Sequence, residues 1–231
     1  MLQKLRFTPS SVLVRALLPG PVEHLLQHLG TDHIPIASGR MIFTGTSLRG
    51  AFLVDPQPHL DERGSFARTW CQREFEAHGL EPVVVQCSSV VSAQAGTLRG
   101  MHYQCAPHEE AKLVRCVRGS IFEVILDLRL GSPTFAKHYA VVLSAANRRM
   151  LYVPKGFAQG YQTLEPDTEV LYQMSDFHAP AYARGVRWND PAFAICWPPA
   201  TRRIISARDQ QYPDFDRRVQ VEQSYRIASR G

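Results

Sequence analysis

One histidine, His102, has a setting that suits acid–base chemistry. It lies in the segment 98–104, and the chain continues with Lys112, Tyr172 and Asp190. A histidine removes protons near neutral pH, and an aspartate can orient its ring. A lysine stabilises developing oxyanion charge, and a tyrosine can return the proton. These residue types are what proton removal from carbon requires, so the sequence favours an enzyme over a binding module.

Composition sets the broad class of the protein. The chain has 231 residues, of which 45% are hydrophobic and 20% charged. This composition is globular, and all-β domains often reach this length as one domain. The net charge of +5 comes without a dense basic stripe or a nucleic-acid-binding module, so no nucleic-acid partner is expected. A modest positive charge also suits a phosphorylated small molecule.

Cysteine usage and hydropathy predict the compartment. The five cysteines are odd in number and form no C-x-x-C pair, which argues against a disulfide framework or a zinc site. Free thiols fit a reducing compartment, so we expect a cytoplasmic protein. No apolar run approaches the length of a membrane span, and the first twenty residues lack a signal-peptide pattern. No membrane association is therefore expected.

Short apolar runs separated by turn residues dominate the chain from Gly50 onward. One convincing helix is expected in this part, over residues 73–78. Many short strands without intervening helices favour an all-β architecture, a jelly-roll cupin barrel with short peripheral helices. The predicted strands cover residues 83–85, 113–117, 121–128, 139–143, 150–153 and 170–174.

The ends of the chain differ from this pattern. Residues 22–29 have the spacing of a short amphipathic helix, and we interpret residues 1–46 as an N-terminal extension. His24, His28 and His33 lie there, but a solvated helix face is favoured over a metal site because no carboxylate or cysteine accompanies them. The predicted organisation is thus an extension (1–46), a barrel domain (47–216) and a peripheral tail (217–231).

Residues 147–160 resemble the second motif of cupins, in which a turn with proline and glycine precedes a metal-binding histidine. Gln159 occupies that histidine position here. The first cupin motif requires His-x-His, and this chain has His102-Tyr103-Gln104. Amides are poor ligands for iron or zinc, so we expect a cupin scaffold without its metal.

A set of ordered motifs across residues 50–216 makes the resemblance specific. Together they are similar to the dTDP-4-dehydrorhamnose 3,5-epimerase family. The motifs are Leu98-Arg99-Gly100-Met101-His102-Tyr103-Gln104, Lys112-Leu113-Val114-Arg115, Gly131-Ser132-Pro133-Thr134-Phe135, Val153-Pro154-Lys155-Gly156-Phe157-Ala158 and Arg187-Trp188-Asn189-Asp190-Pro191, with Asp61-Glu62-Arg63-Gly64 and Ser206-Ala207-Arg208-Asp209 on either side.

The resemblance implies an isomerase of deoxysugar biosynthesis, which inverts C3 and C5 of a nucleotide-linked 4-keto-6-deoxyhexose. It implies that His102 is the base and that Asp190 fixes its tautomer. It further implies that Lys112 stabilises the enolate and that Tyr172 protonates the opposite face. Each of the four residues also has a purely structural alternative. His102 could be a core histidine and Asp190 a turn residue, and Lys112 could be a strand-end lysine and Tyr172 a packing residue.

The same resemblance implies a substrate site, a homodimer and no cofactor, because the substrate's own carbonyl is the electron sink. Arg63 and Arg99 match positions that hold the diphosphate, with surface salt bridges as the alternative. Gln86 matches a position near the nucleotide. The full set expected to bind the nucleotide-diphospho-sugar is Arg63, Arg99, Gln86, Gln104, Gln159, Phe66 and Phe177.

Departures from the family pattern leave alternatives open. Gln159 replaces a histidine and cannot act as a base, while Arg68, Ser88 and the pair Phe177-His178 replace common residues on the nucleotide side. A single-centre epimerase of a specialised nucleotide sugar is one alternative. A catalytically silent cupin that binds a nucleotide sugar is another. A metal-dependent cupin oxygenase is the least favoured.

Overall fold

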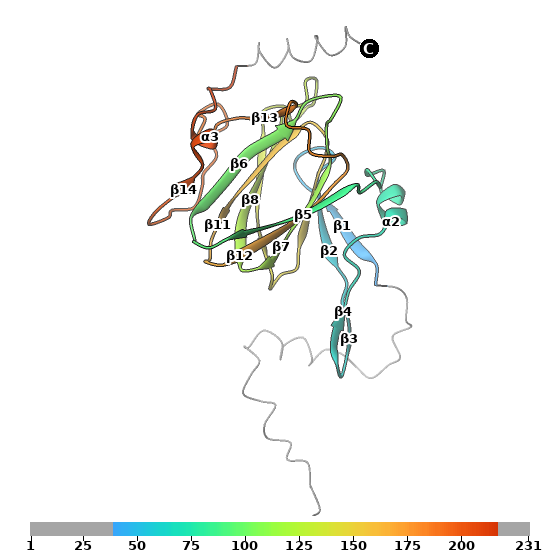
Figure 1. Ribbon diagram of the computed structural model, residues 1–231. Coiled ribbons are helices and arrows are strands. Elements are labelled where there is room, and N and C mark those ends of the chain that lie inside the picture. Colours follow the sequence, from blue (N-terminus) through green and yellow to red (C-terminus); the bar gives the residue numbers. More distant parts are fainter. Residues whose placement is uncertain (1–38, 217–231) are drawn as a thin grey trace, which may run out of the picture. The chain divides into compact units, whose positions relative to one another are not determined.

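The protein is described by a computed structural model over residues 39–216, and this part is built almost entirely from β-strands in two facing sheets (Figure 1). This confirms the predicted all-β class. The helix expected at residues 22–29, the three histidines of the extension and the tail at 217–231 lie outside the described residues.

The first sheet, which we call the β7 sheet, is antiparallel throughout, and β5 forms one edge. Its strand order is β1 (Met41–Gly45), β2 (Phe52–Pro56), β10 (Met150–Val153), β7 (Lys112–Arg118), β12 (Thr168–Met174) and β5 (Gln86–Ser92). Strand β1 falls within the span expected to be an N-terminal extension, but it pairs along its full length with β2.

The second sheet, the β8 sheet, faces the first. A short strand, β14, adds to β6 in parallel orientation and leads into the one-turn helix α3 (Ala207–Gln210). The strand order is β13 (Ala183–Gly185), β6 (Thr97–Gln104), β11 (Phe157–Thr163), β8 (Ser120–Asp127) and β9 (His138–Ser144), with β14 (Ile204–Ile205) beside β6.

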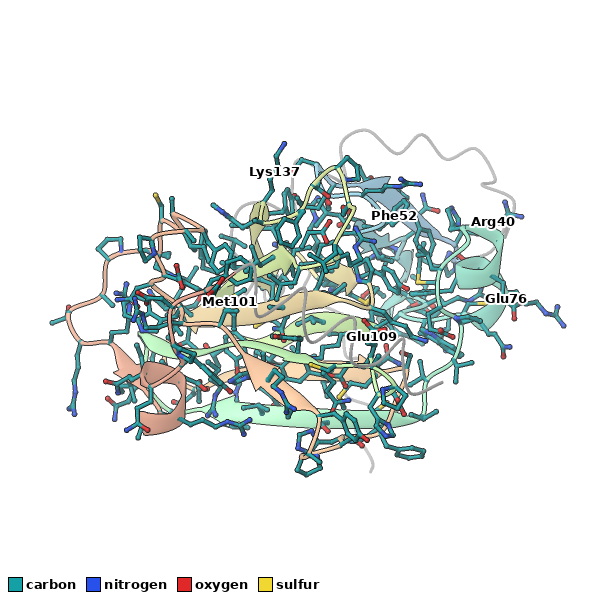
Figure 2. All side chains as sticks on the ribbon, turned by 90° about the horizontal axis from the view of Figure 1, so that it is seen from above. Arg40, Phe52, Glu76, Met101, Glu109 and Lys137 are labelled. Atoms are coloured by element: carbon teal, nitrogen blue, oxygen red, sulfur yellow. The ribbon has the colours of Figure 1, made fainter. Side chains whose placement is uncertain are left out.

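The main core lies between the sheets, and seen from above the side chains fill the space between the ribbons (Figure 2). Val114 and Val170 from the β7 sheet meet Ile125 and Tyr161 from the β8 sheet in this core. Strand β8 is apolar at most of its positions, with Glu123 as an exception, because its alternate residues, such as Val124, pack into a second cluster on its other face. Burial on both faces explains why this strand was recognisable in the sequence.

A smaller cluster covers the outer face of the β7 sheet. The helix α2 (Gln72–Ala77) inserts Phe75 there, and its ring contacts Phe43 and Tyr152 edge-on. A two-stranded hairpin, β3 (His59–Asp61) and β4 (Gly64–Phe66), extends away from the barrel (Figure 1). The hairpin exposes apolar side chains at Leu60 and Phe66.

Five of the six predicted strands and the predicted helix at residues 73–78 are present. The strand predicted at residues 83–85 is wrong, because β5 begins at Gln86. Val85 still donates its backbone N–H to Met174, so the segment approaches β12 without forming a ladder. Strands β6 and β11 escaped prediction because both contain glycine and several polar residues.

Those two strands approach each other unusually closely. A Cβ atom placed on Gly100 would lie 2.6 Å from the Cα atom of Gly160, and Gly100 has a φ of +124°. Only glycine fits both the conformation and the space. This close approach lies next to the position where His102 on β6 pairs with Gln159 on β11.

Candidate active site

A cavity of about 650 Å³ opens between the two sheets. Strands β5, β6, β7, β11 and β12 contribute to its wall, and α3 closes one side. Alternate residues of a strand face opposite sides, so each strand contributes its inward-facing side chains. Six of the predicted catalytic and substrate-binding residues line this cavity: Arg99, His102, Gln104, Lys112, Gln159 and Tyr172.

His102 is paired with a carboxylate. Its Nε2 atom lies 2.7 Å from Oδ1 of Asp209 on α3. The other carboxylate oxygen accepts the backbone N–H of Gly100 at 3.1 Å, and the hydroxyl of Ser206 accepts the N–H of Asp209. Burial opposes the charge on Asp209, but the hydrogen bonds from His102, Gly100 and Ser206 outweigh it and lower its pKa. The ring is therefore held through Nε2 by an ionised carboxylate, which leaves Nδ1 as the nitrogen that can take up a proton.

Asp190 does not make this contact, which corrects the expectation that it orients His102. Its Oδ1 atom accepts the backbone N–H of Ala192 at 2.8 Å, and its Oδ2 atom accepts that of Phe215 at 2.5 Å. Asp190 is buried, and its side chain ties together two loop segments. These contacts agree with the alternative interpretation, in which Asp190 is a structural residue of a turn.

Among residues 39–216, Lys112 is the only lysine that lines the cavity. Its Nζ atom forms an ion pair with Oε1 of Glu110 at 3.0 Å, and both side chains are largely buried. The pairing offsets part of the cost of burying both charges. Glu110 therefore holds the lysine at the wall of the cavity.

Tyr172 reaches the cavity from the neighbouring strand β12. Burial raises the pKa of its phenol well above the usual value, with Tyr161 and Glu123 adding to the effect. The ring of Tyr161 lies 6.4 Å away between centroids. At neutral pH Tyr172 is thus a protonated hydroxyl, able to give a proton to a strong base.

Guanidinium groups gather on the same wall. Arg99 on β6, Arg184 on β13 and Arg208 on α3 all line the cavity. Arg184 donates from Nη1 to two backbone carbonyls, and Arg208 lies over the ring of Tyr212. Forked, permanently charged groups at one cavity suit a diphosphate.

Two glutamines complete the wall in different ways. The amide of Gln104 is used by a loop: it donates to the carbonyls of His108 and Phe177 and accepts the N–H of Ala179. Gln159 instead donates from Nε2 to Oε1 of the buried Glu123 at 2.7 Å. Gln104 therefore shapes the rim, whereas the other end of the Gln159 amide remains for the cavity.

The remaining predicted binding residues do not line this cavity. Arg63 forms an exposed ion pair with Asp61 on the β3–β4 hairpin. The hairpin also carries Phe66, which is 73% exposed. Gln86 accepts the backbone N–H of His178, and Phe177 is exposed beside it. Within residues 39–216, the wall of the cavity therefore includes none of these four side chains.

Sequence reasoning missed several residues of the cavity. Asp209 was within reach, because the segment Ser206-Ala207-Arg208-Asp209 belongs to the resemblance and contains a carboxylate. Glu123, which contacts Gln159 from behind the cavity wall, also had a signal, since an acidic residue interrupts an otherwise apolar strand. Glu110 and Arg184 carried no signal in spacing or composition.

Other features of the described part limit the kinds of site present. No group of three or more histidine, cysteine, aspartate or glutamate residues between residues 39 and 216 has the arrangement to hold a metal ion. All five cysteines are free thiols. No helix in this range is long and apolar enough to cross a membrane.

Comparison with known proteins gives a consistent family. Residues 45–217 match the family model described as dTDP-4-dehydrorhamnose 3,5-epimerase. The chain is also 38% identical over 175 residues to dTDP-4-dehydrorhamnose 3,5-epimerase of Sinorhizobium fredii, covering 76% of this chain and 90% of that protein.

Solved structures agree with the sequence comparison. The dTDP-4-dehydrorhamnose 3,5-epimerase of Bacillus anthracis, crystallised with TDP and pyrophosphate, superposes with a TM-score of 0.73 at 39% identity, covering 76% of this chain and 100% of that chain. A 3'-monoepimerase from Streptomyces bikiniensis, in complex with dTDP-quinovose, gives a TM-score of 0.68 at 31% identity, with coverages of 79% and 89%.

Proposed function

Because this chain belongs to the dTDP-4-dehydrorhamnose 3,5-epimerase family and is therefore an isomerase, we propose that its cavity binds a dTDP-linked 4-keto-6-deoxyhexose and inverts C3 and C5. The observation that carries the proposal is the convergence of three groups on one cavity. These are the His102–Asp209 pair, the Lys112 ammonium and the protonated Tyr172 phenol. Such an enzyme acts in deoxysugar biosynthesis.

Proton removal is the first step of this mechanism. The 4-keto group makes the hydrogens on C3 and C5 acidic, and the free nitrogen of His102 takes one of them. The electron pair of the broken C–H bond moves onto the ketone oxygen and gives an enolate. Asp209, hydrogen-bonded to Nε2, stabilises the imidazolium that forms.

Lys112 stabilises the enolate oxygen. An ammonium aimed at a developing oxyanion lowers the barrier most where water is excluded, and the Lys112 side chain is largely buried. Glu110, which also lines the cavity, keeps the ammonium in position. In the free enzyme this pair also offsets the cost of burying the lysine charge.

Protonation from the opposite face completes the inversion. Tyr172 gives its phenolic proton to the ring carbon, and the enolate returns to the ketone. His102 has then gained one proton and Tyr172 has lost one, so both exchange with solvent before the second carbon reacts. Burial of Tyr172 keeps the phenol protonated until the strongly basic enolate forms.

The arginines of the cavity wall suit the diphosphate of the substrate. Arg99 was expected in this role, and Arg184 and Arg208 extend the same positive surface. Arg63, Phe66, Gln86 and Phe177 lie outside the cavity of one chain. We propose that a homodimer brings the hairpin residues of one subunit to the nucleotide site of the other.

The proposed reaction uses neither a metal nor another cofactor. The substrate ketone accepts the electron pair, and the chain has an amide at Gln159 where metal-binding cupins have histidine. A cytoplasmic location remains a prediction from cysteine usage.

A single-centre epimerase is the second candidate. The replacement of histidine by Gln159 on the cavity wall favours it, because an amide offers hydrogen bonds but no base. The similarity to a 3'-monoepimerase also supports this alternative. Both candidates share the first proton transfer and differ in how many carbons react.

The deciding experiment is NMR of the purified protein with dTDP-4-keto-6-deoxyglucose in deuterium oxide. Deuterium uptake at both C3 and C5 supports two-centre epimerisation. Uptake at one carbon identifies the single-centre enzyme. Absence of uptake at both carbons, while the protein binds dTDP, would leave a silent nucleotide-sugar-binding protein.

A further inference from the structure

A buried carboxyl group lies behind the cavity wall and takes no part in the mechanism above. Glu123 on β8 is fully buried, and its Oε1 atom accepts the hydrogen bond from Gln159 Nε2 at 2.7 Å. Its Oε2 atom has no hydrogen-bond partner among the described residues. A group this isolated from water is costly unless it has a specific role or loses its charge.

The surroundings of Glu123 keep the carboxyl group uncharged at neutral pH. Burial raises its pKa to about 8, although the Gln159 hydrogen bond and the positive charge of Lys112 act in the other direction. Tyr161, its neighbour on β11, Tyr172 on β12 and Cys116 on β7 are the other titratable groups that interact with it. The result is a neutral acid whose one engaged oxygen is committed to Gln159.

The consequence of this contact lies at the other end of the amide. A glutamine side chain has a donor and an acceptor on opposite sides, and a hydrogen bond at one end decides which end is presented elsewhere. The donor end of Gln159 points inward to Glu123, so Oε1 is left for the cavity. Gln159 pairs across the sheet with His102, which puts this acceptor beside the proposed base.

We propose that Glu123 is a positioning residue that acts through Gln159, and that together they present a hydrogen-bond acceptor to a sugar hydroxyl next to the carbon that His102 deprotonates. Gln159 is then a specificity-determining residue for sugars that carry this hydroxyl. His102 and Lys112, which share the wall, are donors when protonated, so the Gln159 carbonyl adds a different kind of contact. The inference rests on the proposed function.

The test compares sugars that differ by one hydroxyl. The wild-type protein is assayed for deuterium exchange with dTDP-4-keto-6-deoxyglucose and with its 2-deoxy and 3-deoxy analogues. Exchange with the first substrate establishes the proposed function before any variant is made. Its absence would be a failure of that function and not of the positioning role.

The variants Glu123→Met and Glu123→Gln then separate volume from hydrogen bonding. Methionine fills the site but cannot hold the Gln159 amide, whereas glutamine offers a carbonyl oxygen to Nε2. We expect Glu123→Met to reduce the preference, in kcat/KM, for the hydroxylated substrate over at least one analogue by roughly three- to tenfold. We expect Glu123→Gln to retain the wild-type preference.

Two results would overturn the proposal. One is an unchanged preference in Glu123→Met for both analogues, and the other is an equal loss in both variants. Thermal melting reports whether each variant folds. Should Glu123→Met fail to fold, Gln159→Met removes the acceptor directly from the cavity wall, and a wild-type preference in that variant would likewise refute the role.

Discussion

Nε2 of His102 on β6 lies 2.7 Å from Oδ1 of Asp209 on α3, although the two residues are 107 positions apart in the chain. The contact depends on β14, which runs parallel to β6 and delivers the chain to the short helix. Ser206 caps that helix, and Gly100 donates to the second carboxylate oxygen. The carboxylate is thus fixed from three directions, and so is the tautomer of the ring.

The variant Asp209→Asn should lose most of the exchange activity. An amide can place its NH₂ group against Nε2, which favours the tautomer with its proton on Nδ1 and removes the charge that stabilises the imidazolium. We expect kcat to fall by roughly a hundredfold or more, with a smaller change in dTDP affinity. Steady-state kinetics and calorimetric titration with dTDP measure the two effects.

The matched control is Asp190→Asn, which alters a carboxylate of the same type outside the cavity. Asp190 accepts two backbone N–H groups, and asparagine can satisfy only one of them through its carbonyl. We expect a loss of about 1 kcal/mol in the free energy of unfolding. A kcat loss in Asp190→Asn as large as that in Asp209→Asn would contradict the assignment of Asp209.

Tyr172→Phe should separate proton removal from inversion. The phenylalanine ring keeps the packing beside Tyr161, but the proton donor on that face is gone. We expect deuterium uptake to continue through His102 while the inverted product decreases by roughly tenfold or more. NMR that follows isotope content and stereochemistry together makes the measurement. Equal losses of exchange and inversion would argue against a role as the acid.

Glu123→Gln should make the stability less dependent on pH. The pKa of Glu123 is raised from 4.5 to about 8, so between these values the unfolded chain has released a proton that the folded protein keeps. The free energy of unfolding of the wild type therefore falls as pH rises through this window. We expect the free energy of unfolding of the variant, relative to that of the wild type, to increase by a few kcal/mol between pH 5 and pH 8, on the order of one per pH unit.

Urea unfolding at several pH values across that window measures the difference. Glu62→Gln, which removes an exposed carboxyl group, is the control for loss of one acidic residue. If the difference in the free energy of unfolding between Glu123→Gln and the wild type stayed constant with pH, Glu123 would be ionised throughout. That result would contradict a neutral Glu123 carboxyl group behind the cavity.

The sequence predicted the fold where a physical pattern was strong. Strand β8 is buried on both faces and is mostly apolar, with Glu123 as its interruption, whereas β11 is equally buried but contains Gln159, Gly160 and Gln162. Buried polar residues, such as Gln159 on the cavity wall and Gln162 with its bonds to Pro198 and Arg203, look like loop residues in a sequence. The same limit affected the partner of His102, since Asp190 and Asp209 both follow recognisable motifs. The two aspartates are distinguished by the parallel pairing of β14 with β6, which brings Asp209 to His102.

The position of Arg63 gives the last prediction, which concerns the homodimer. Arg63 lies on the exposed β3–β4 hairpin, outside the cavity of its own chain. If the hairpin serves the partner's nucleotide site, Arg63→Gln and His102→Ala should complement each other. Co-expression with two different tags isolates the heterodimer. One of its two sites then combines His102 of one chain with Arg63 of the other, so we expect about half of the wild-type exchange rate.

Each variant alone provides the baseline for this experiment. Homodimers of His102→Ala should show almost no exchange, and homodimers of Arg63→Gln should bind dTDP more weakly, with the deficit shrinking at high salt. A heterodimer rate equal to the mean of the two homodimer rates would mean that Arg63 does not act across subunits. Failure to isolate any heterodimer would count against the dimer itself. Recovery above that mean would show that the nucleotide site is shared between subunits.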